Sequence, residues 1–397
     1  MKYLCKRSTK SYFTLQQFSL IPLDLLLLAT SVESGFWEDF YRILASQNAK
    51  RNLIYSPISA EIIMSMVYMA SGGKTFEELR NVLKFSENKT LVANNYRSLL
   101  SDLKRRETFI ILHMANRIYV NKKYCLVPEF NQLARKAFKA KAKSIRLDDP
   151  VSASAIVNSW ILNRTRGMIR NIVLPKDFNS DTSAFLVNAI YFKGQWLYNF
   201  KADQTHIADF YVSANEIIPV KMMTLSASLL SGYIDDIDAK IIELPYWNST
   251  LSMRIILPNS VDGLRKLKEK VGFIDYHLEK KSVNVKLPKF KIESKAQLKG
   301  IFENLGILDV FKPSADLNGL VLESGAKIDK IVQKAFLKID EKGGEASAAT
   351  GVLTRRKKSI DNLIQPPMEF IADHPFFYVI HDNKVIYFQG HIVEPRW

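Results

Sequence analysis

Residues 341–359 read EKGGEASAATGVLTRRKKS. The stretch starts like the end of a strand, thins to Gly, Ala, Ser and Thr, and finishes in four consecutive positive charges, Arg355 to Lys358. No proline interrupts it, so every backbone N–H that a strand donates to a neighbouring strand is present. The sequence therefore predicts a segment that can join a sheet and that carries a basic quartet directly behind it.

Alternate positions of this segment differ in character when Gly344 is taken as the first. Successive side chains of a strand point to opposite faces, so one set is buried when a strand enters a packed sheet. A flexible surface linker, the alternative, would also be rich in small residues but gives no reason for charge on one parity only. The inward set has no charge and nothing larger than valine (Gly344, Ala346, Ala348, Thr350, Val352, Thr354), whereas the outward set carries both charges (Glu345, Ser347, Ala349, Gly351, Leu353, Arg355).

The composition favours one large domain. The chain has 397 residues, yet no Pro/Gly/Ser-rich linker, repeat or low-complexity block interrupts it from about residue 36 onward. A net charge of +16 suggests phosphate binding, but there is no zinc-ligand pattern or RNP-like aromatic motif, and much of the excess is scattered lysine. We expect a monomer with no nucleic-acid partner and no membrane span.

The densest basic patch lies in an expected helix and its exit. Lys104-Arg105-Arg106 forms a smaller cluster. Because sulfate groups bind clustered cations, the larger patch is a candidate site for a sulfated polysaccharide, and a solvated charged face is the alternative. Its members are Arg135, Lys136, Lys139, Lys141, Lys143 and Arg146, of which Arg135, Lys136, Lys139 and Lys143 are the candidate polyanion site.

Residues 1–31 are expected to be a signal region. FSLIPLDLLLLATS (18–31) has a short apolar core followed by small residues, but Asp24 interrupts it and the charged leader is long. Because MKYLC (1–5) joined to LLLLATS (25–31) would make a compact signal peptide, we hypothesise that residues 6–24 are an insertion and that a secreted chain begins near Val32. The apolar run is too short to span a bilayer.

Cysteines and sequons also bear on whether the chain is secreted. Cys5 would leave with the signal, so the mature chain has one free thiol, Cys125, and no internal disulfide. Three sequons, at Asn88, Asn163 and Asn248, are compatible with a secretory route, and Asn88 and Asn248 are the expected glycosylation sites.

Hydrophobic periodicity predicts helices first and long strands later. Ser56-Pro57 opens a helix that is apolar on nearly every side and ends at Gly72-Gly73, and TFEELRNVL (75–83) follows with Thr75 and Glu78 as a capping box. This order indicates an α+β fold with large, mostly antiparallel sheets. Further helices are expected at 36–45, 92–105, 128–142 and 152–170, and strands at 109–120, 184–192, 239–246, 251–258, 283–293, 331–340, 376–382 and 384–392.

Motifs of known enzyme chemistry are missing. The six histidines form no HExxH or other close ligand pair, two cysteines cannot build a zinc site, and neither G-x-S-x-G nor G-x-G-x-x-G occurs. A lone histidine such as His374 is more often a structural hydrogen-bonding group than a base. We expect no metal, no cofactor and no enzyme activity.

Several stretches together resemble the serpin family of serine protease inhibitors, and the particular residues in them are similar to those of insect serpins. They run in family order over essentially all of residues 36–397. The resemblance implies the serpin fold, with helices packed on large sheets and an exposed reactive-centre loop at about 341–365. The stretches are Asn158-x-Trp160 with Thr165, LVNAIYFKGQW (186–196), VKMM (220–223), ELPY (243–246), LPKFKIES (287–294), ADLNGL (315–320), QKAFLKIDEKG (333–343), ADHPFFYVI (372–380) and FQGHIVEP (388–395).

The resemblance also implies roles for particular residues. The loop is bait for a protease, and after cleavage its first part inserts into the main sheet. Ser56, Asn188 and Gln333 would form a hydrogen-bonded shutter beneath the opening sheet, with Gln333 where many members carry histidine, and Trp196 would lie at the breach where insertion begins. The implied hinge is Glu341, Gly343, Gly344, Glu345, Ala346, Ser347, Ala348 and Ala349, with Gly344 replacing the usual Thr or Ser.

Family spacing places the reactive bond at Lys357-Lys358, with Arg355 or Arg356 as alternative specificity residues. A lysine there suits a trypsin-like protease, whose primary pocket ends in a carboxylate. The quartet RRKK also resembles the sites of subtilisin-like proprotein convertases, although those prefer arginine last. A non-inhibitory serpin that serves as carrier, chaperone or storage protein is the alternative from another class.

Overall fold

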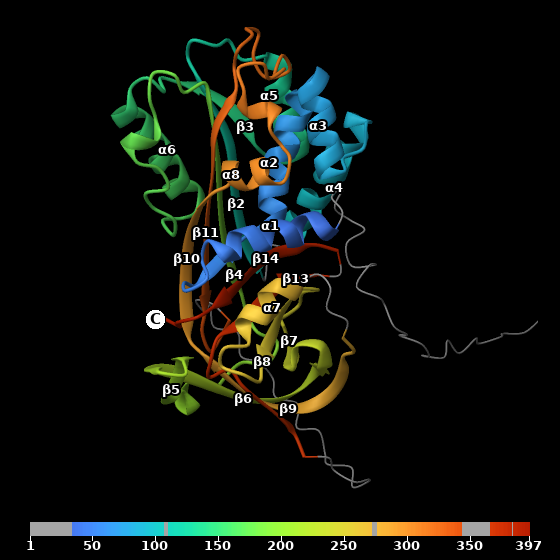
Figure 1. Ribbon diagram of the computed structural model, residues 1–397, viewed down its shortest axis with the longest axis vertical. Helices are drawn as coiled ribbons and strands as arrows, with labels where there is room; N and C mark the ends of the chain where they lie inside the picture. Colours follow the sequence, from blue (N-terminus) through green and yellow to red (C-terminus); the bar gives the residue numbers. More distant parts are fainter. Residues whose placement is uncertain (1–33, 107–109, 272–275, 344–365, 383) are drawn as a thin grey trace, which may run out of the picture.

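Two sheets organise the part of the chain that the computed structural model describes, residues 34–106, 110–271, 276–343, 366–382 and 384–397 (Figure 1). One sheet has five strands in the order β10-β11-β4-β2-β3, and the other has nine, in the order β1-β14-β13-β8-β7-β6-β9-β12 with β5 paired to β6. Most neighbouring strands are antiparallel, which confirms the expected α+β fold with helices on large mixed sheets.

The elements follow the chain in the order that Figure 1 labels. The helices are α1 (Ser34–Ser46), α2 (Pro57–Ala70), α3 (Gly73–Leu83), α4 (Lys89–Arg106), α5 (Pro128–Phe138), α6 (Pro150–Arg164), α7 (Leu264–Lys270) and α8 (Lys299–Asn304). The strands are β1 (Leu53–Tyr55), β2 (Ile110–Asn121), β3 (Lys141–Ile145), β4 (Ala184–Gly194), β5 (His206–Ser213), β6 (Glu216–Ile234), β7 (Ala239–Pro245), β8 (Ser252–Pro258), β9 (Glu279–Pro288), β10 (Phe290–Gln297), β11 (Ile328–Ile339), β12 (Met368–Ile371), β13 (Phe376–His381) and β14 (Ile386–Ile392).

The five-stranded sheet is covered on both faces. Along β4, Leu186 and Ile190 join the large core on the α2 side, whereas Phe185 and Val187 join a second core beneath α6. Both sets are buried because successive strand side chains point to opposite faces and each face has a helix over it. A strand that entered this sheet would therefore bury the side chains of both parities beneath α6. Near the loop turn, where Lys193, Phe336 and Lys338 are only half-buried, the side chains on that one face would stay partly exposed.

The centre of this sheet holds a parallel pair. β11 runs parallel to β4, with Val332 opposite Val187 and Gln333 opposite Asn188, whereas β11 is antiparallel to β10 and β4 is antiparallel to β2. No short turn joins parallel neighbours, because a crossover connection is needed between them. β2 and β3 are also parallel, but only β11 leads directly into the loop, so a strand formed by the loop could separate β4 from β11 and run antiparallel to both.

The expected strand at 283–293 is wrong, because the chain splits there into two strands of different sheets. β9 ends at Pro288 and pairs with β6, and β10 begins at Phe290 and pairs with β11. Proline has no N–H to continue the ladder, so pairing changes at this point.

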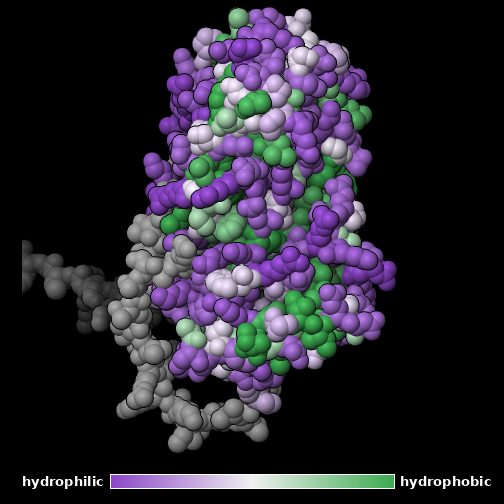
Figure 2. Space-filling model, turned by 90° about the vertical axis from the view of Figure 1, so that its left-hand side faces the viewer, coloured by the Kyte–Doolittle hydropathy of each residue, from purple (hydrophilic) through white to green (hydrophobic). Residues whose placement is uncertain are grey.

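β5 and the long β6 were not among the expected strands. On these two strands the large apolar residues Ile207, Tyr211 and Ile217 are exposed. Figure 2 shows apolar side chains gathered on the lower half of the face toward β5.

The expected capping box of the third helix is also wrong. α3 begins at Gly73, two residues before Thr75, whose buried hydroxyl donates to Asp309 Oδ2 at 2.5 Å. The Glu78 carboxylate accepts from the backbone N–H of Asp309 at 2.7 Å instead of capping its own helix. The side chains of Thr75 and Glu78 do not cap the helix, because both form hydrogen bonds with Asp309, which is distant in sequence.

Two further helices are shorter than their periodicity predicts. α5 ends at Phe138, where Lys139 turns left-handed with φ 52°, and residues 141–145 form β3 instead of a last helical turn. α6 ends at Arg164, before the expected end at 170. Among the helices of the described chain, none has the length and apolar character that a membrane crossing needs.

Candidate functional site

The chain leaves β11 through a tight turn at the end of the five-stranded sheet where β11 and β4 terminate. We call this end of the sheet its mouth. The N–H of Gly343 donates to the carbonyl of Asp340 at 3.0 Å, and Gly343 has φ 92°. A Cβ at this position would lie 2.6 Å from Gly194 O and 2.8 Å from Trp196 N, so only glycine fits. The turn reverses the chain beside β4, the neighbour of β11.

Trp196 fixes the backbone of this turn. Its indole Nε1 donates to Asp340 O at 3.0 Å, its backbone N–H donates to Lys342 O at 3.0 Å, and the side chain is 2% exposed. The ring stacks on Tyr246 with centroids 4.5 Å apart. The tryptophan expected at the breach therefore lies where the two central strands meet the start of the loop.

Glu341 adds an ionic anchor at the same place. Its carboxylate accepts from Thr205 Oγ1 at 2.9 Å and lies 2.8 Å from Lys289 Nζ. Burial alone would raise the pKa of the Glu341 carboxyl, but the hydrogen bonds from Lys289 and Thr205 outweigh it and hold the pKa below its usual range. The first two expected hinge residues, Glu341 and Gly343, are thus held firmly by the scaffold.

Gln333 ties β11 to the start of α2. Its Oε1 accepts from the backbone N–H of Ser56 at 2.8 Å, and its Nε2 donates to the carbonyl of Ser56 at 3.0 Å. The Ser56 hydroxyl in turn caps α2 by accepting from Ser59 N at 3.3 Å. A neutral amide satisfies both backbone groups, so this latch contains no group that titrates near neutral pH.

Asn188 ties β4 to the same end of α2 through different partners. Its Nδ2 donates to Ser59 O at 2.9 Å and contacts Ser59 Oγ and Asn116 Oδ1. Asn188 and Gln333 are neighbours in the β4–β11 register, but each bonds to α2 separately. The expected shutter residues therefore hold the two central strands by independent attachments to one helix end.

Sequence reasoning missed Ser59 and Asn116 as members of this network. Ser59 looked like an ordinary residue of a core helix, although its position three residues after the Ser56 cap was a usable signal. Asn116 interrupts the apolar run of β2, and a polar residue inside a buried strand needs a hydrogen-bonding partner.

The remaining loop predictions lie outside the described residues, as does the signal region with residues 6–24. This part of the hinge comprises Gly344, Glu345, Ala346, Ser347, Ala348 and Ala349, and the specificity positions are Arg355, Arg356, Lys357 and Lys358.

The expected surface sites lie on exposed parts of the described chain. Arg135 and Lys136 are exposed in the last turn of α5, Lys139 follows the helix, and Lys143 is exposed on β3. The sequon residue Asn88 is exposed and accepts from Leu91 N at 3.1 Å at the start of α4.

The other two sequons differ in accessibility. Asn248 occupies an exposed turn with φ 46°. At Asn163 the sequon hydroxyl, Thr165, is fully buried and donates to Ile161 O at 2.8 Å. Asn163 itself is exposed, as Asn248 is, so the two sequons differ in their hydroxyl residue: Thr165 is buried, whereas Thr250 is exposed.

His374 has structural partners. Its Nε2 lies 2.5 Å from Pro258 O and its Nδ1 lies 2.7 Å from Asp373 Oδ1. Within the described ranges, no three His, Cys, Asp or Glu side chains come close enough together to hold a metal ion.

Comparison with known proteins agrees with this architecture. The family model described as serpin (serine protease inhibitor) matches residues 32–395. Serine protease inhibitor 42Dd of Drosophila melanogaster is 42% identical over 94% of this chain and 99% of its own length, and human leukocyte elastase inhibitor is 34% identical over 92% and 99%. The crystal structure of Serpin48 from the insect Tenebrio molitor superposes with a TM-score of 0.84 at 33% identity, covering 91% of this chain and 97% of that one. The chain belongs to the serpin family.

Proposed function

We propose that this protein is a secreted inhibitor of trypsin-like serine proteases that acts as a suicide substrate. The observation that carries the proposal is the parallel pair β4 and β11, with the loop leaving β11 through a turn directly beside it. After cleavage in the loop, the segment behind Gly343 becomes a free end attached to β11. It can then enter between the two strands and run antiparallel to both.

The driving force is the pairing of a strand that was previously unpaired. About a dozen residues, each gaining net ~0.5–1.5 kcal/mol from backbone hydrogen bonds, contribute on the order of 10 kcal/mol before the entropy of ordering is subtracted. This is comparable to the stability of a whole domain. Insertion can then displace a covalently attached protease and distort its catalytic site, and it traps the protease when it is faster than hydrolysis of the acyl-enzyme ester.

The absence of charge at every second position of the loop from Gly344 to Thr354 supports insertion. Ala346 and Ala348 would face a sheet whose two faces are already packed, where large or charged side chains are excluded. Lys357 before the reactive bond would place its ammonium against the carboxylate of a trypsin-like pocket.

A trapping experiment tests the proposal. The full chain is incubated with trypsin and, in parallel, with a subtilisin-like proprotein convertase, and the products are analysed by denaturing gel and mass spectrometry. We expect a trypsin complex that survives boiling in detergent and cleavage after Lys357. A stable complex with the convertase alone would reassign the target, and rapid turnover without any complex would support a carrier, chaperone or storage role instead.

Matched loop variants test the parity. Ala346→Arg places a charge at an inward position and should give cleavage without trapping, whereas Ser347→Arg places the same charge at an outward position and should still trap. Equal trapping by both variants contradicts the insertion register.

The exposed basic residues of α5 and β3 are proposed to bind a sulfated polysaccharide and thereby speed association with the protease. An association rate with trypsin that is unchanged by heparin rules this out.

Secretion is proposed from the signal-like residues 1–31 and the sequons. Amino-terminal sequencing of the native protein tests the hypothesis that residues 6–24 are an insertion. Recovery of residues 6–24 would contradict it.

A further inference from the structure

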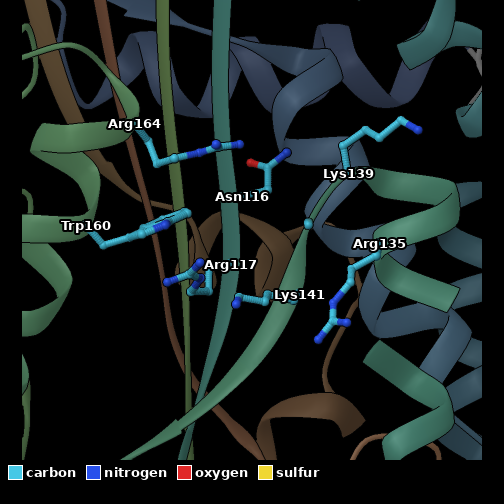
Figure 3. A pocket seen from close by; sticks show the side chains of 8 residues that line it. Asn116, Arg117, Arg135, Lys139, Lys141, Trp160 and Arg164 are labelled. Carbon is cyan, nitrogen blue, oxygen red and sulfur yellow. The ribbon is translucent and has the colours of Figure 1, made fainter. Parts of the chain in front are cut away.

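A basic cavity lies at the edge of the sheet between α5 and α6, away from the loop turn. It has a volume of about 300 Å³, is open to solvent, and is lined by residues of β2, β3 and the ends of α5 and α6 (Figure 3). A second cavity of about 430 Å³ adjoins it and shares Asn116, Lys139 and Arg164 with it. Neither the loop nor the shutter explains why cations gather here.

Arg117 is the most informative residue of this cavity. It lies on β2, is 9% exposed, and its Nε has no hydrogen-bond partner. Within the described residues no carboxylate forms an ion pair with it, and its guanidinium lies 3.8 Å from the centre of the Trp160 ring. Burial lowers the pKa of Arg117 most, the neighbouring Tyr119 hydroxyl offsets part of this shift, and the charge of Arg164 lowers the pKa further. A buried cation without a counter-ion is costly, and a cation–π contact offsets only part of that cost.

Three other elements bring more positive charge to the same space. In Figure 3, Arg164 extends from the end of α6 toward Asn116, and Arg135 and Lys141 line the opposite wall, whereas Lys139 points away. The charge of Arg117 is the leading cause that lowers the pKa of Lys141. Within the described residues the lining of the cavity contains no acid, and no ion pair joins Arg117, Arg164 or Lys141 to one, so no carboxylate offsets their repulsion.

A structural role for Arg117 alone would be to stack on Trp160 and brace α6 against β2. That role explains the orientation of one guanidinium. It does not explain the convergence of Arg164, Lys141 and Arg135 from three further elements around one hollow. Like charges are brought together at a cost that an anionic ligand removes.

We propose that this cavity binds a small molecule that carries two or more phosphate or sulfate esters. Guanidinium groups form paired hydrogen bonds with the oxygens of such esters, and the two arginines, Arg117 and Arg164, approach from different walls. The volume is at the lower end of ligand sites and accommodates a ring-sized molecule. The site shares Arg135 and Lys139 with the candidate polyanion site, but Arg117 and Arg164 belong to the cavity alone and Lys136 and Lys143 do not line it.

Binding is measured on the full chain by calorimetry and thermal unfolding, with no protease present. The probes are inositol hexakisphosphate, sucrose octasulfate and inorganic phosphate. We expect one molecule of an ester probe to bind per chain and to raise Tm, with inorganic phosphate much weaker because it bridges fewer cations. The tighter of the two ester probes assigns the ester type.

Charge-matched variants decide whether the cavity is the site. The double variant Arg117→Met/Arg164→Gln and the double variant Lys136→Gln/Lys143→Gln each remove two positive charges. We expect the first to weaken binding by at least about tenfold and the second by less than about twofold, because only the first removes groups that contact the ligand. Arg164→Gln alone, at an exposed position, serves if the buried substitution unfolds the chain. Equal weakening by both double variants, or no ester binding at all, overturns the proposal.

Discussion

At the scale of single residues, buried acids store a dependence of stability on pH. Glu61 lies on α2 with no exposed surface, accepts from Trp37 Nε1 at 3.2 Å and also bonds to the Tyr96 hydroxyl. Burial raises the pKa of Glu61 to about 7. Its folded pKa therefore exceeds its unfolded pKa, and the folded state holds a proton that the unfolded state releases between the two values.

Glu61→Gln should remove this dependence. The stability that Glu61 contributes is present below pH ~4.5 and is lost as the pH rises to about 7, a loss of up to about 3 kcal/mol, whereas a glutamine that keeps both hydrogen bonds loses nothing. Urea unfolding at pH 5 and pH 8 should show that the free energy of unfolding of the variant, relative to that of the parent, is higher at pH 8 than at pH 5. Exposed Glu216→Gln is the control, and a constant difference between Glu61→Gln and the parent at both pH values would contradict the raised pKa.

Gly343→Ala should destabilise the mouth of the sheet. The added Cβ meets Gly194 O and Trp196 N and must also adopt φ 92°. We expect a loss of about 2–4 kcal/mol, seen as a lower urea midpoint. Gly167→Ala is the matched control, because Gly167 has φ 83° but nothing within 4 Å of the new Cβ. An equal loss in both variants would mean that backbone strain alone matters at this turn.

At the scale of elements, the sequence predicted the kind of most elements but not their boundaries. Thr75 and Glu78 have the spacing of a capping box, yet their side chains bond to the segment around Asp309, which is distant in sequence. The run at 283–293 was expected as one strand, although its apolar positions change phase at Pro288, from 283, 285 and 287 to 290 and 292. Only the three-dimensional pairing shows that β9 and β10 belong to different sheets.

The candidate site was predictable where family motifs carry it. Trp196, Gln333 and Asn188 were found through the resemblance, because they lie in the motifs that identify the family. Ser59 was not found, since its role depends on how α2 is placed against β4. The cavity around Arg117 could not be predicted either, because its lining residues come from four elements and only the fold brings them together.

Gln333→Leu should loosen the attachment of β11 to α2. The leucine keeps the volume but leaves the buried N–H of Ser56 without a partner, which costs about 1–3 kcal/mol, whereas the Ser56 carbonyl keeps the N–H of Ala60 at 3.2 Å. Thermal unfolding of the intact chain should show a lower Tm. Ser226→Ala, which removes an exposed hydrogen bond to Asn284, should leave Tm nearly unchanged. A Gln333→Leu variant as stable as the parent would mean that water replaces the amide.

At the scale of the whole molecule, the five-stranded sheet has room for one more strand in its topology. β4 and β11 are parallel neighbours, and each is held separately to the start of α2. Opening the sheet therefore requires these attachments to yield, and a sixth strand would replace them with two antiparallel ladders. This is the physical basis on which the intact chain is expected to be the less stable form.

Cleavage in the loop should raise the thermal stability of the chain. If the segment behind Gly343 enters the sheet, added bonds worth on the order of 10 kcal/mol should raise Tm by tens of degrees. Scanning calorimetry before and after limited digestion measures the change. Ala346→Arg should show no such rise after the same digestion, and an unchanged Tm in the cleaved parent would contradict insertion.

The two ends of the loop are built into different sheets, and this makes the proposed reaction a single event for each molecule. β11 precedes the loop in the five-stranded sheet, and β12 follows it at the edge of the nine-stranded sheet beside β9. Once the first part of a severed loop lies between β4 and β11, its new terminus is separated from the one that stays with β12, so the peptide bond cannot be remade. Such a protein is consumed mole for mole, and the duration of its effect is set by the rate of new synthesis.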